Sequence, residues 1–178
     1  MAHELDLRPS ALAGQWYPGD RERLASSVDA YIDAARLPEL HGELVAVMAP
    51  HAGHRYSGPV AGYAFAAVRD SVQRGSVPEL VAVVSPMHYP TSGQVLTSAH
   101  EGYSTPLGAI PLDQDALQAL DAYLQVELGV GLTQVKRDTE HCLEIALPFL
   151  PRALKNDFRL LPVMVRDASP HAARGLGR

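Results

Sequence analysis

Residues 80–88 read Leu80-Val-Ala-Val-Val-Ser-Pro-Met-His88, a short apolar run that leads into a proline and a histidine. Continuous apolar runs are typical of strands covered on both faces, as in a parallel sheet, because a strand with one solvated face alternates apolar and polar residues. A second segment has the same form, since Leu44-Val-Ala-Val-Met-Ala49 runs into Pro50-His-Ala-Gly-His54. The two segments predict two buried strands, each followed by a proline and a histidine.

Helical patterns surround these strands. Between them, Ala61, Phe65, Val68 and Val72 recur at helical spacing within residues 59–73. Strand, helix and strand together have the length of a βαβ unit. We also expect helices at 20–35, 113–128 and 140–154, with Pro148 and Pro151 bending or splitting the last, a third strand at 160–165, and antiparallel edge strands within 89–110.

The length and composition fit one domain. The chain has 178 residues, of which 47% are hydrophobic and 20% charged, enough for one sizeable core but not for two. The predicted elements indicate an α/β fold with a mixed, largely parallel central sheet flanked by helices. A last helix starts with Ser169 as its cap and Pro170 in its first turn, and Gly175 follows almost at once. We therefore expect residues 1–178 to form a single α/β domain that is incomplete at its C-terminus.

Charge and cysteine content exclude several classes of function. The net charge of −5 gives no attraction to nucleic acid or to anionic membrane surfaces. The only cysteine is Cys142, so neither an internal disulfide nor a cysteine-rich zinc site can form. The N-terminus lacks the apolar core of a signal peptide, and no apolar run approaches the roughly 20 residues needed to span a bilayer. We expect a cytoplasmic protein.

The two strand-end histidines are the main functional signal. Ligand sites in open α/β sheets form beyond the carboxyl ends of strands. If the two strands are neighbours, about 5 Å apart, His51 and His88 can reach one ion at the roughly 2 Å distance of an imidazole ligand. A lone histidine in such a loop is most often structural, whereas two such loops in register leave a structural role and a metal site equally open. His54 either competes with His51 as a ligand or faces water beside Arg55.

A third histidine lies in Asp138-Thr-Glu-His-Cys-Leu-Glu144. His141 begins the helix predicted at 140–154 and could be a ligand or a proton donor and acceptor near neutral pH. Asp138 and Glu140 flank it and could orient its ring. Acidic residues also favour helix N-termini through the helix dipole, which is our preferred interpretation of Glu140 and Glu144. For Cys142 we expect a small buried hydrophobic residue rather than a thiolate ligand.

Five motifs extend the pattern over residues 8–178. In chain order they are Arg8-Pro-Ser-Ala-Leu-Ala-Gly-Gln-Trp-Tyr-Pro18, Pro50-His-Ala-Gly53 with Tyr56-Ser-Gly58, Pro86-Met-His88, Thr105-Pro-Leu-Gly108, and Glu140-His-Cys-Leu-Glu144 with Leu147-Pro-Phe149. Any one of them is weak, but all five in order resemble the Memo family, which is called AmmeMemoRadiSam system protein B in bacteria.

The resemblance implies an αβα sandwich similar to the class III extradiol dioxygenases, which open aromatic rings with non-haem iron. By this resemblance His51 and His88 match the two histidine ligands, for iron or else copper, and His141 matches a further histidine that lines the pocket. The family's third ligand comes from a later segment, and Asp138 is the nearest substitute here. The chain departs from the family at His54, Ser85 and Cys142, where tyrosine, glycine and serine are usual.

Three hypotheses about function follow. In the first, the chain is a metal-binding, dioxygenase-like oxidoreductase of unknown substrate, with His51 and His88 as ligands and His141 as acid, base or auxiliary ligand. In the second, it is a non-catalytic module that binds a peptide or small molecule in the strand-end cleft. In the third, it is a metal-dependent hydrolase with Glu140 as the base. Oxygen consumption with catechols separates the first from the second.

Overall fold

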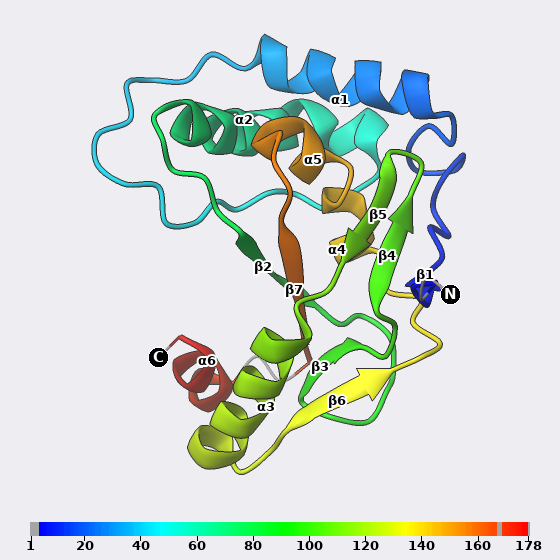
Figure 1. Ribbon diagram of the computed structural model, residues 1–178, viewed down its shortest axis with the longest axis vertical. Coiled ribbons are helices and arrows are strands. Elements are labelled where there is room, and N and C mark those ends of the chain that lie inside the picture. Colours follow the sequence, from blue (N-terminus) through cyan, green and yellow to red (C-terminus); the bar gives the residue numbers. More distant parts are fainter. Residues whose placement is uncertain (1–3, 167–168, 178) are drawn as a thin grey trace.

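The computed structural model describes residues 4–166 and 169–177, which fold into two sheets flanked by helices (Figure 1). The helices are α1 (Arg21–Ala34), α2 (His54–Gln73), α3 (Gln114–Leu128), α4 (Cys142–Ala146), α5 (Phe149–Leu154) and α6 (Pro170–Leu176). The strands are β1 (Leu7–Arg8), β2 (Leu80–Pro86), β3 (Val95–Ser98), β4 (Gly102–Thr105), β5 (Gly108–Pro111), β6 (Leu132–Val135) and β7 (Arg159–Val165). The predicted mixed α/β class is confirmed.

The larger sheet has the strand order β2-β7-β3-β6. β2 and β7 are parallel along their whole length, β3 and β6 are also parallel, and only the β3–β7 pair is antiparallel. The predicted strands at 80–84 and 160–165 are therefore real neighbours in a mixed, largely parallel sheet. The smaller sheet, β1-β4-β5, contains a β4–β5 hairpin that turns after Thr105.

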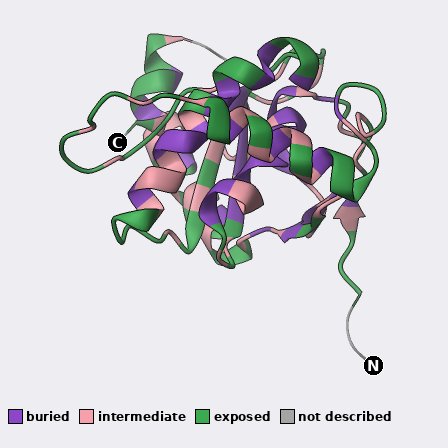
Figure 2. Ribbon diagram, turned by 90° about the horizontal axis from the view of Figure 1, so that it is seen from above, coloured by how far each residue is buried: buried purple, intermediate pink, exposed green. Residues whose placement is uncertain are grey.

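Helices cover the larger sheet on both sides, with α1, α2 and α5 on one side and α3 and α6 on the other (Figure 1). Helices α1, α2 and α5 share an apolar core with the face of the sheet that they cover. Leu24, Phe65, Phe149 and Leu160 are buried in this core. Figure 2 shows the buried residues in purple. The second core lies around Val95, Leu124 and Val163. These layers are those of an αβα sandwich. No helix in the described parts of the chain is long and apolar enough to cross a membrane.

Local signals set most helix boundaries. The Asp20 carboxylate accepts a hydrogen bond from the backbone N–H of Arg23 at the start of α1, and Asp113 does the same for Ala116 at the start of α3, which is the geometry of an N-cap. The predicted helix at 140–154 is split into α4 and α5 at Pro148, as expected. The predicted cap Ser169 accepts from the backbone of Ala172 and begins α6.

The predicted strand at 44–49 is wrong. Residues 44–49 form no regular secondary structure and pair with no strand among the described residues, and the side chains of Val45 and Met48 are 91% and 94% exposed. An apolar run forms a strand only if a neighbouring chain accepts its backbone hydrogen bonds, and the sheet instead ends at β2. The predicted βαβ unit therefore lacks its first strand.

Two further expectations need correction. The helix predicted at 59–73 begins earlier, at His54, because the Gly53 carbonyl accepts hydrogen bonds from Tyr56 and Ser57 and starts the first turn there. Of the antiparallel edge strands expected within 89–110, β5 is confirmed, since it pairs antiparallel with β4 at the edge of the smaller sheet. The strand at Val95 is not at an edge, because β3 lies between β7 and β6. Strand β6 was not predicted, because its residues carry no continuous apolar run.

Candidate metal centre

His51, His88 and His141 converge although they come from three distant segments. The ring centroids are 5.4 Å apart for His51 and His88, 5.7 Å for His51 and His141, and 4.8 Å for His88 and His141. One ligand atom from each histidine and the Sγ atom of Cys142 all lie within 4.8 Å of one another. His51 and His88 are exposed, while His141 is partly and Cys142 fully buried, so the group opens to solvent on one side.

His88 follows directly after β2. The backbone N–H of Met87 still bonds to the Val165 carbonyl of β7, at 2.9 Å, so the sheet fixes the start of the loop. The next N–H, that of His88, donates to Oε2 of Glu140 at 2.5 Å, and the ring Nδ1 lies 3.0 Å from Oε1 of the same carboxylate. The end of β2 and one glutamate thus determine where this imidazole lies.

His51 reaches the group without the strand that was predicted before it. The turn after it is held by the backbone N–H of His54, which donates to the Trp16 carbonyl at 2.9 Å, and by the Ser57 hydroxyl, which donates to the Ala52 carbonyl at 2.6 Å. Gly53 lies against Trp16, where an added Cβ would be 3.3 Å from the Trp16 carbonyl oxygen. The start of α2 and the Trp16 loop therefore place His51.

His54 is neither a ligand nor a surface residue, so both alternatives for it are wrong. It is buried, its Nε2 donates to the Ile145 carbonyl at 3.0 Å, and its ring packs against Tyr17 and Phe149. Burial lowers the pKa of His54, although the bond to Ile145 opposes this, and the ring is neutral. His54 ties the first turn of α2 to α4.

Glu140 is the residue that orients the site. Its Oε1 atom lies 3.0 Å from Nδ1 of His88 and 3.1 Å from Nδ1 of His141, and it accepts the backbone N–H groups of His141 and Cys142. Burial acts to raise the pKa of Glu140, but these hydrogen bonds and those from His88 outweigh it and lower the pKa to about 2. The helix-dipole interpretation of Glu140 is therefore insufficient.

A shared acceptor has a direct consequence for the two imidazoles. When Nδ1 of each ring donates its proton to Glu140, each Nε2 keeps a free lone pair, which is the form that binds a metal. Burial lowers the pKa of His141, the neighbouring His88 and His51 lower it further, and Glu140 acts in the opposite direction. His141 is thus a neutral imidazole at neutral pH. The pKa of the Cys142 thiol is raised to about 12 by burial and by the Glu140 carboxylate.

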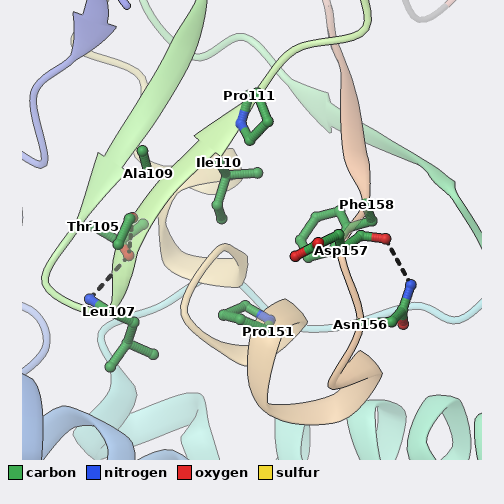
Figure 3. Close-up of a pocket in the computed structure, with 10 residues that line it drawn as sticks. Thr105, Leu107, Ala109, Ile110, Pro111, Pro151, Asn156, Asp157 and Phe158 are labelled. Carbon is green, nitrogen blue, oxygen red and sulfur yellow. Dashed lines mark hydrogen bonds between the residues drawn. The ribbon is translucent and has the colours of Figure 1, made fainter.

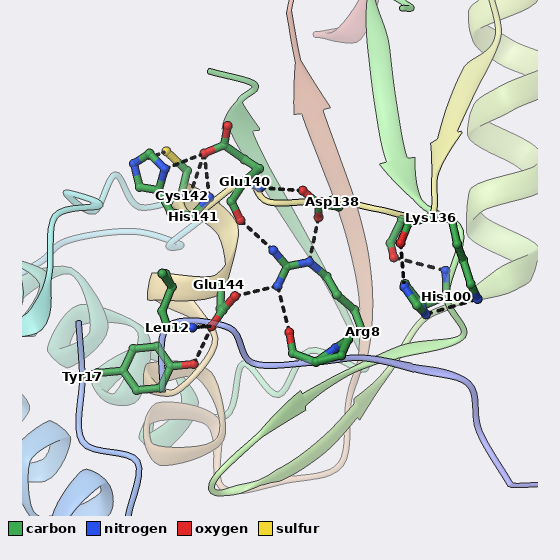
Figure 4. A network of polar contacts seen from close by, with 12 residues as sticks. Arg8, Leu12, Tyr17, His100, Lys136, Asp138, Glu140, His141, Cys142 and Glu144 are labelled. Atoms are coloured by element: carbon green, nitrogen blue, oxygen red, sulfur yellow. Dashed lines mark hydrogen bonds and ion pairs between the residues drawn. The ribbon is translucent and has the colours of Figure 1, made fainter. Parts of the chain in front are cut away.

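Arg8 holds the segment that carries Glu140 and His141 (Figure 4). Its guanidinium donates to Asp138 Oδ2 at 2.8 Å, to Glu144 Oε2 at 2.6 Å and to the Glu140 carbonyl at 2.8 Å. The other Glu144 oxygen accepts from the Tyr17 hydroxyl and the Leu12 backbone. All of the charged side chains in this network are almost fully buried. Their opposite charges therefore stabilise one another in place of water.

This network removes Asp138 as a substitute ligand. Its Oδ2 bonds to Arg8, its Oδ1 accepts the backbone N–H of Glu140 at 2.7 Å, and the side chain is only 2% exposed. Glu144 is likewise engaged on both oxygens. The roles of Arg8 and Trp16 were not predicted. The ring centroid of Trp16 lies 5.0 Å from that of His141. The only signal for these two residues was the motif at residues 8–18.

A hollow elsewhere on the molecule shares no residue with this cluster (Figure 3). It lies between the β4–β5 hairpin and the region around α5, and it is lined by Thr105, Ile110, Pro151, Asn156 and Phe158 among others. The Thr105 hydroxyl donates to the Gly108 carbonyl and the Asn156 amide nitrogen donates to the Asp157 carbonyl. The histidine cluster remains the candidate site.

The Memo-like protein family model matches residues 8–178 of this chain. This chain belongs to the Memo family. It is 28% identical to a MEMO1 family protein of Nitrosopumilus maritimus over 96% of its length, and 32% identical to those of Ignicoccus hospitalis and Methanopyrus kandleri over 94% and 96%. These matches cover 61%, 59% and 60% of the three relatives. The Memo-family chain therefore spans about three fifths of the length of the relatives it matches.

Replacing Glu140 by glutamine should weaken metal binding roughly 10- to 100-fold, the usual cost of losing a group that orients a ligand. Glutamine keeps only one acceptor oxygen and no negative charge, so the N–H groups of His88, His141 and Cys142 that Glu140 accepts are left with one neutral acceptor, and the two imidazoles are held more weakly. Competition with a chromophoric chelator measures the affinity, and Glu22→Gln on the exposed first turn of α1 is the matched control. Equal affinities for the two variants would contradict the role of Glu140.

The same variant has a pH signature. The folded-state pKa of Glu140, about 2, lies below the ordinary value of 4.5, so the carboxylate stabilises the fold above about pH 4.5 and loses this effect as the pH falls towards about 2. In denaturant unfolding without metal, the difference between wild type and Glu140→Gln should shrink over that range. A constant difference would contradict the low pKa.

Proposed function

We propose that the Memo-family chain carries a non-haem iron, dioxygenase-like site, in which His51 and His88 bind the metal and His141 is an additional nitrogen ligand. The observation that carries the proposal is the approach of their ligand atoms to within 4.8 Å of one another. Glu140 anchors both His88 and His141 through their Nδ1 atoms. This favours a ligand role for His141 over an acid–base role, because each Nε2 atom then has a free lone pair for a metal.

The side chains fit a transition metal better than a hard cation. Neutral imidazoles suit iron, copper, zinc and nickel, whereas magnesium and calcium prefer carboxylate and carbonyl oxygens. The nearby carboxylates of Asp138 and Glu140 already accept hydrogen bonds from Arg8 and the histidines. Iron is our choice because of the family resemblance, with copper as the alternative. Bound there, iron would supply redox chemistry with dioxygen.

Two exposed aromatic side chains beside His141 would contact a ligand next to the metal. Trp16 and Tyr89 are 40% and 46% exposed, and their rings lie 5.0 Å and 6.5 Å from that of His141. Exposed aromatic side chains bind small molecules and peptides at low entropic cost. By contrast, Glu140 cannot act as the base of a hydrolase, because it is buried and its carboxylate oxygens already accept N–H groups. This argues against the hydrolase alternative.

Oxygen uptake tests this function. The iron-loaded chain should consume oxygen when a catechol is added, and the His51→Ala/His88→Ala double variant should not. An oxygen electrode with ring-cleavage absorbance as a second signal measures both. Tight iron binding without any oxygen consumption would overturn the dioxygenase proposal in favour of a ligand-binding module.

A further inference from the structure

Cys142 is a buried residue of the core that also borders the histidine cluster. It is the first residue of α4 and is 4% exposed. Its neighbours Leu143 and Ile145 belong to the main apolar cluster. Its Sγ atom lies 3.5 Å from Nδ1 of His88 and 3.9 Å from Nε2 of His141. A buried sulfur atom therefore borders the two imidazoles that Glu140 orients.

The separation of 3.9 Å between Sγ and Nε2 of His141 is close to that of two donors around one ion, whereas Nδ1 of His88 is the nitrogen that faces Glu140. With metal–nitrogen bonds of about 2.0 Å and metal–sulfur bonds of about 2.3 Å, neighbouring donors in a tetrahedral site are roughly 3.5 Å apart. The contact with Nε2 of His141 is on the side of that ring turned away from Glu140, where the free lone pair is expected. Cys142 is the buried member of the group, whereas His51 and His88 are exposed.

We propose that Cys142 is a fourth protein ligand, so that the site has three imidazoles and one thiolate. This inference rests on the proposed metal site, and it changes the selectivity expected of it, because a thiolate favours thiophilic ions over hard ones. The S–H bond is replaced by a sulfur–metal bond and the proton is released to water. Serine in this position, which is usual in the family, would leave the buried side without a soft donor.

Cobalt(II) tests this inference in the intact chain, in buffer without added thiol. Cobalt bound by nitrogen alone shows ligand-field absorption, whereas a thiolate ligand adds a strong charge-transfer band in the near ultraviolet. Cys142 is the only cysteine, so in wild type such a band can come from no other residue. We expect both kinds of absorption in wild type, and loss of the charge-transfer band alone in Cys142→Ser.

Each outcome has one meaning. Ligand-field absorption that depends on His51 and His88, without the charge-transfer band, would overturn the role of Cys142 and leave the proposed metal site standing. No cobalt binding at all by wild type would overturn both. Since the wild-type spectrum decides the question, the inference remains testable even if the Cys142→Ser protein does not fold.

Discussion

Replacing Arg8 by methionine is expected to lower the free energy of unfolding by about 3–5 kcal/mol, the range measured when one partner of a buried ion pair is removed. Methionine fills much of the same volume, but it leaves Asp138 and Glu144 buried without their cation. Each of these carboxylates lies within 2.8 Å of a guanidinium nitrogen and is at most 2% exposed. The bond to the Glu140 carbonyl is lost as well.

Denaturant unfolding measures this change, and Arg69→Met is the matched control. Arg69 also forms an ion pair, with Asp33 at 2.6 Å, but the two side chains are 24% and 64% exposed. Pairs of this kind contribute less than about 1 kcal/mol because water already solvates both groups. If the two variants lost similar amounts of stability, the Arg8 network would not hold the segment as described.

The second large effect is expected on iron affinity when the proposed ligands are replaced. His51→Ala/His88→Ala should weaken iron binding by more than about 100-fold, because losing two ligands costs at least as much as losing a group that only orients one. Both residues are exposed, so the fold should survive the change. Metal analysis after dialysis and circular dichroism measure these two results.

His41→Ala is the control for the double variant. His41 is 83% exposed, and its nearest acidic group, in Glu39, is 3.9 Å away, so its loss should leave iron binding unchanged. If the double variant kept wild-type affinity for iron, the two histidines would not be ligands. If His41→Ala lost iron as well, binding would not be specific to the cluster.

Local sequence signals predicted several helices and the central pair of strands. The helices predicted at 20–35 and 113–128 begin with Asp20 and Asp113 as N-caps, and the apolar runs at 80–84 and 160–165 pair with each other. Residues 44–49 have the same kind of pattern, but no described strand pairs with them. A pattern indicates that a segment can form a strand, whereas hydrogen bonding to a neighbour decides whether it does.

The site could be predicted only in part for the same reason. The sequence indicated that His88 follows a strand and that His141 lies at the start of a helix. The structure brings both histidines together with His51. The role of Glu140 depends on contacts with His88, a residue far away in the sequence. Arg8 is more distant still, and nothing in its immediate neighbours indicates a buried ion pair with Asp138.

Anomalous diffraction from iron-loaded crystals tests the central claim, that three imidazoles share one ion. We expect a single strong peak about 2 Å from a ring nitrogen of each of His51, His88 and His141. A peak elsewhere on the molecule, or one that touches none of these rings, would contradict the account.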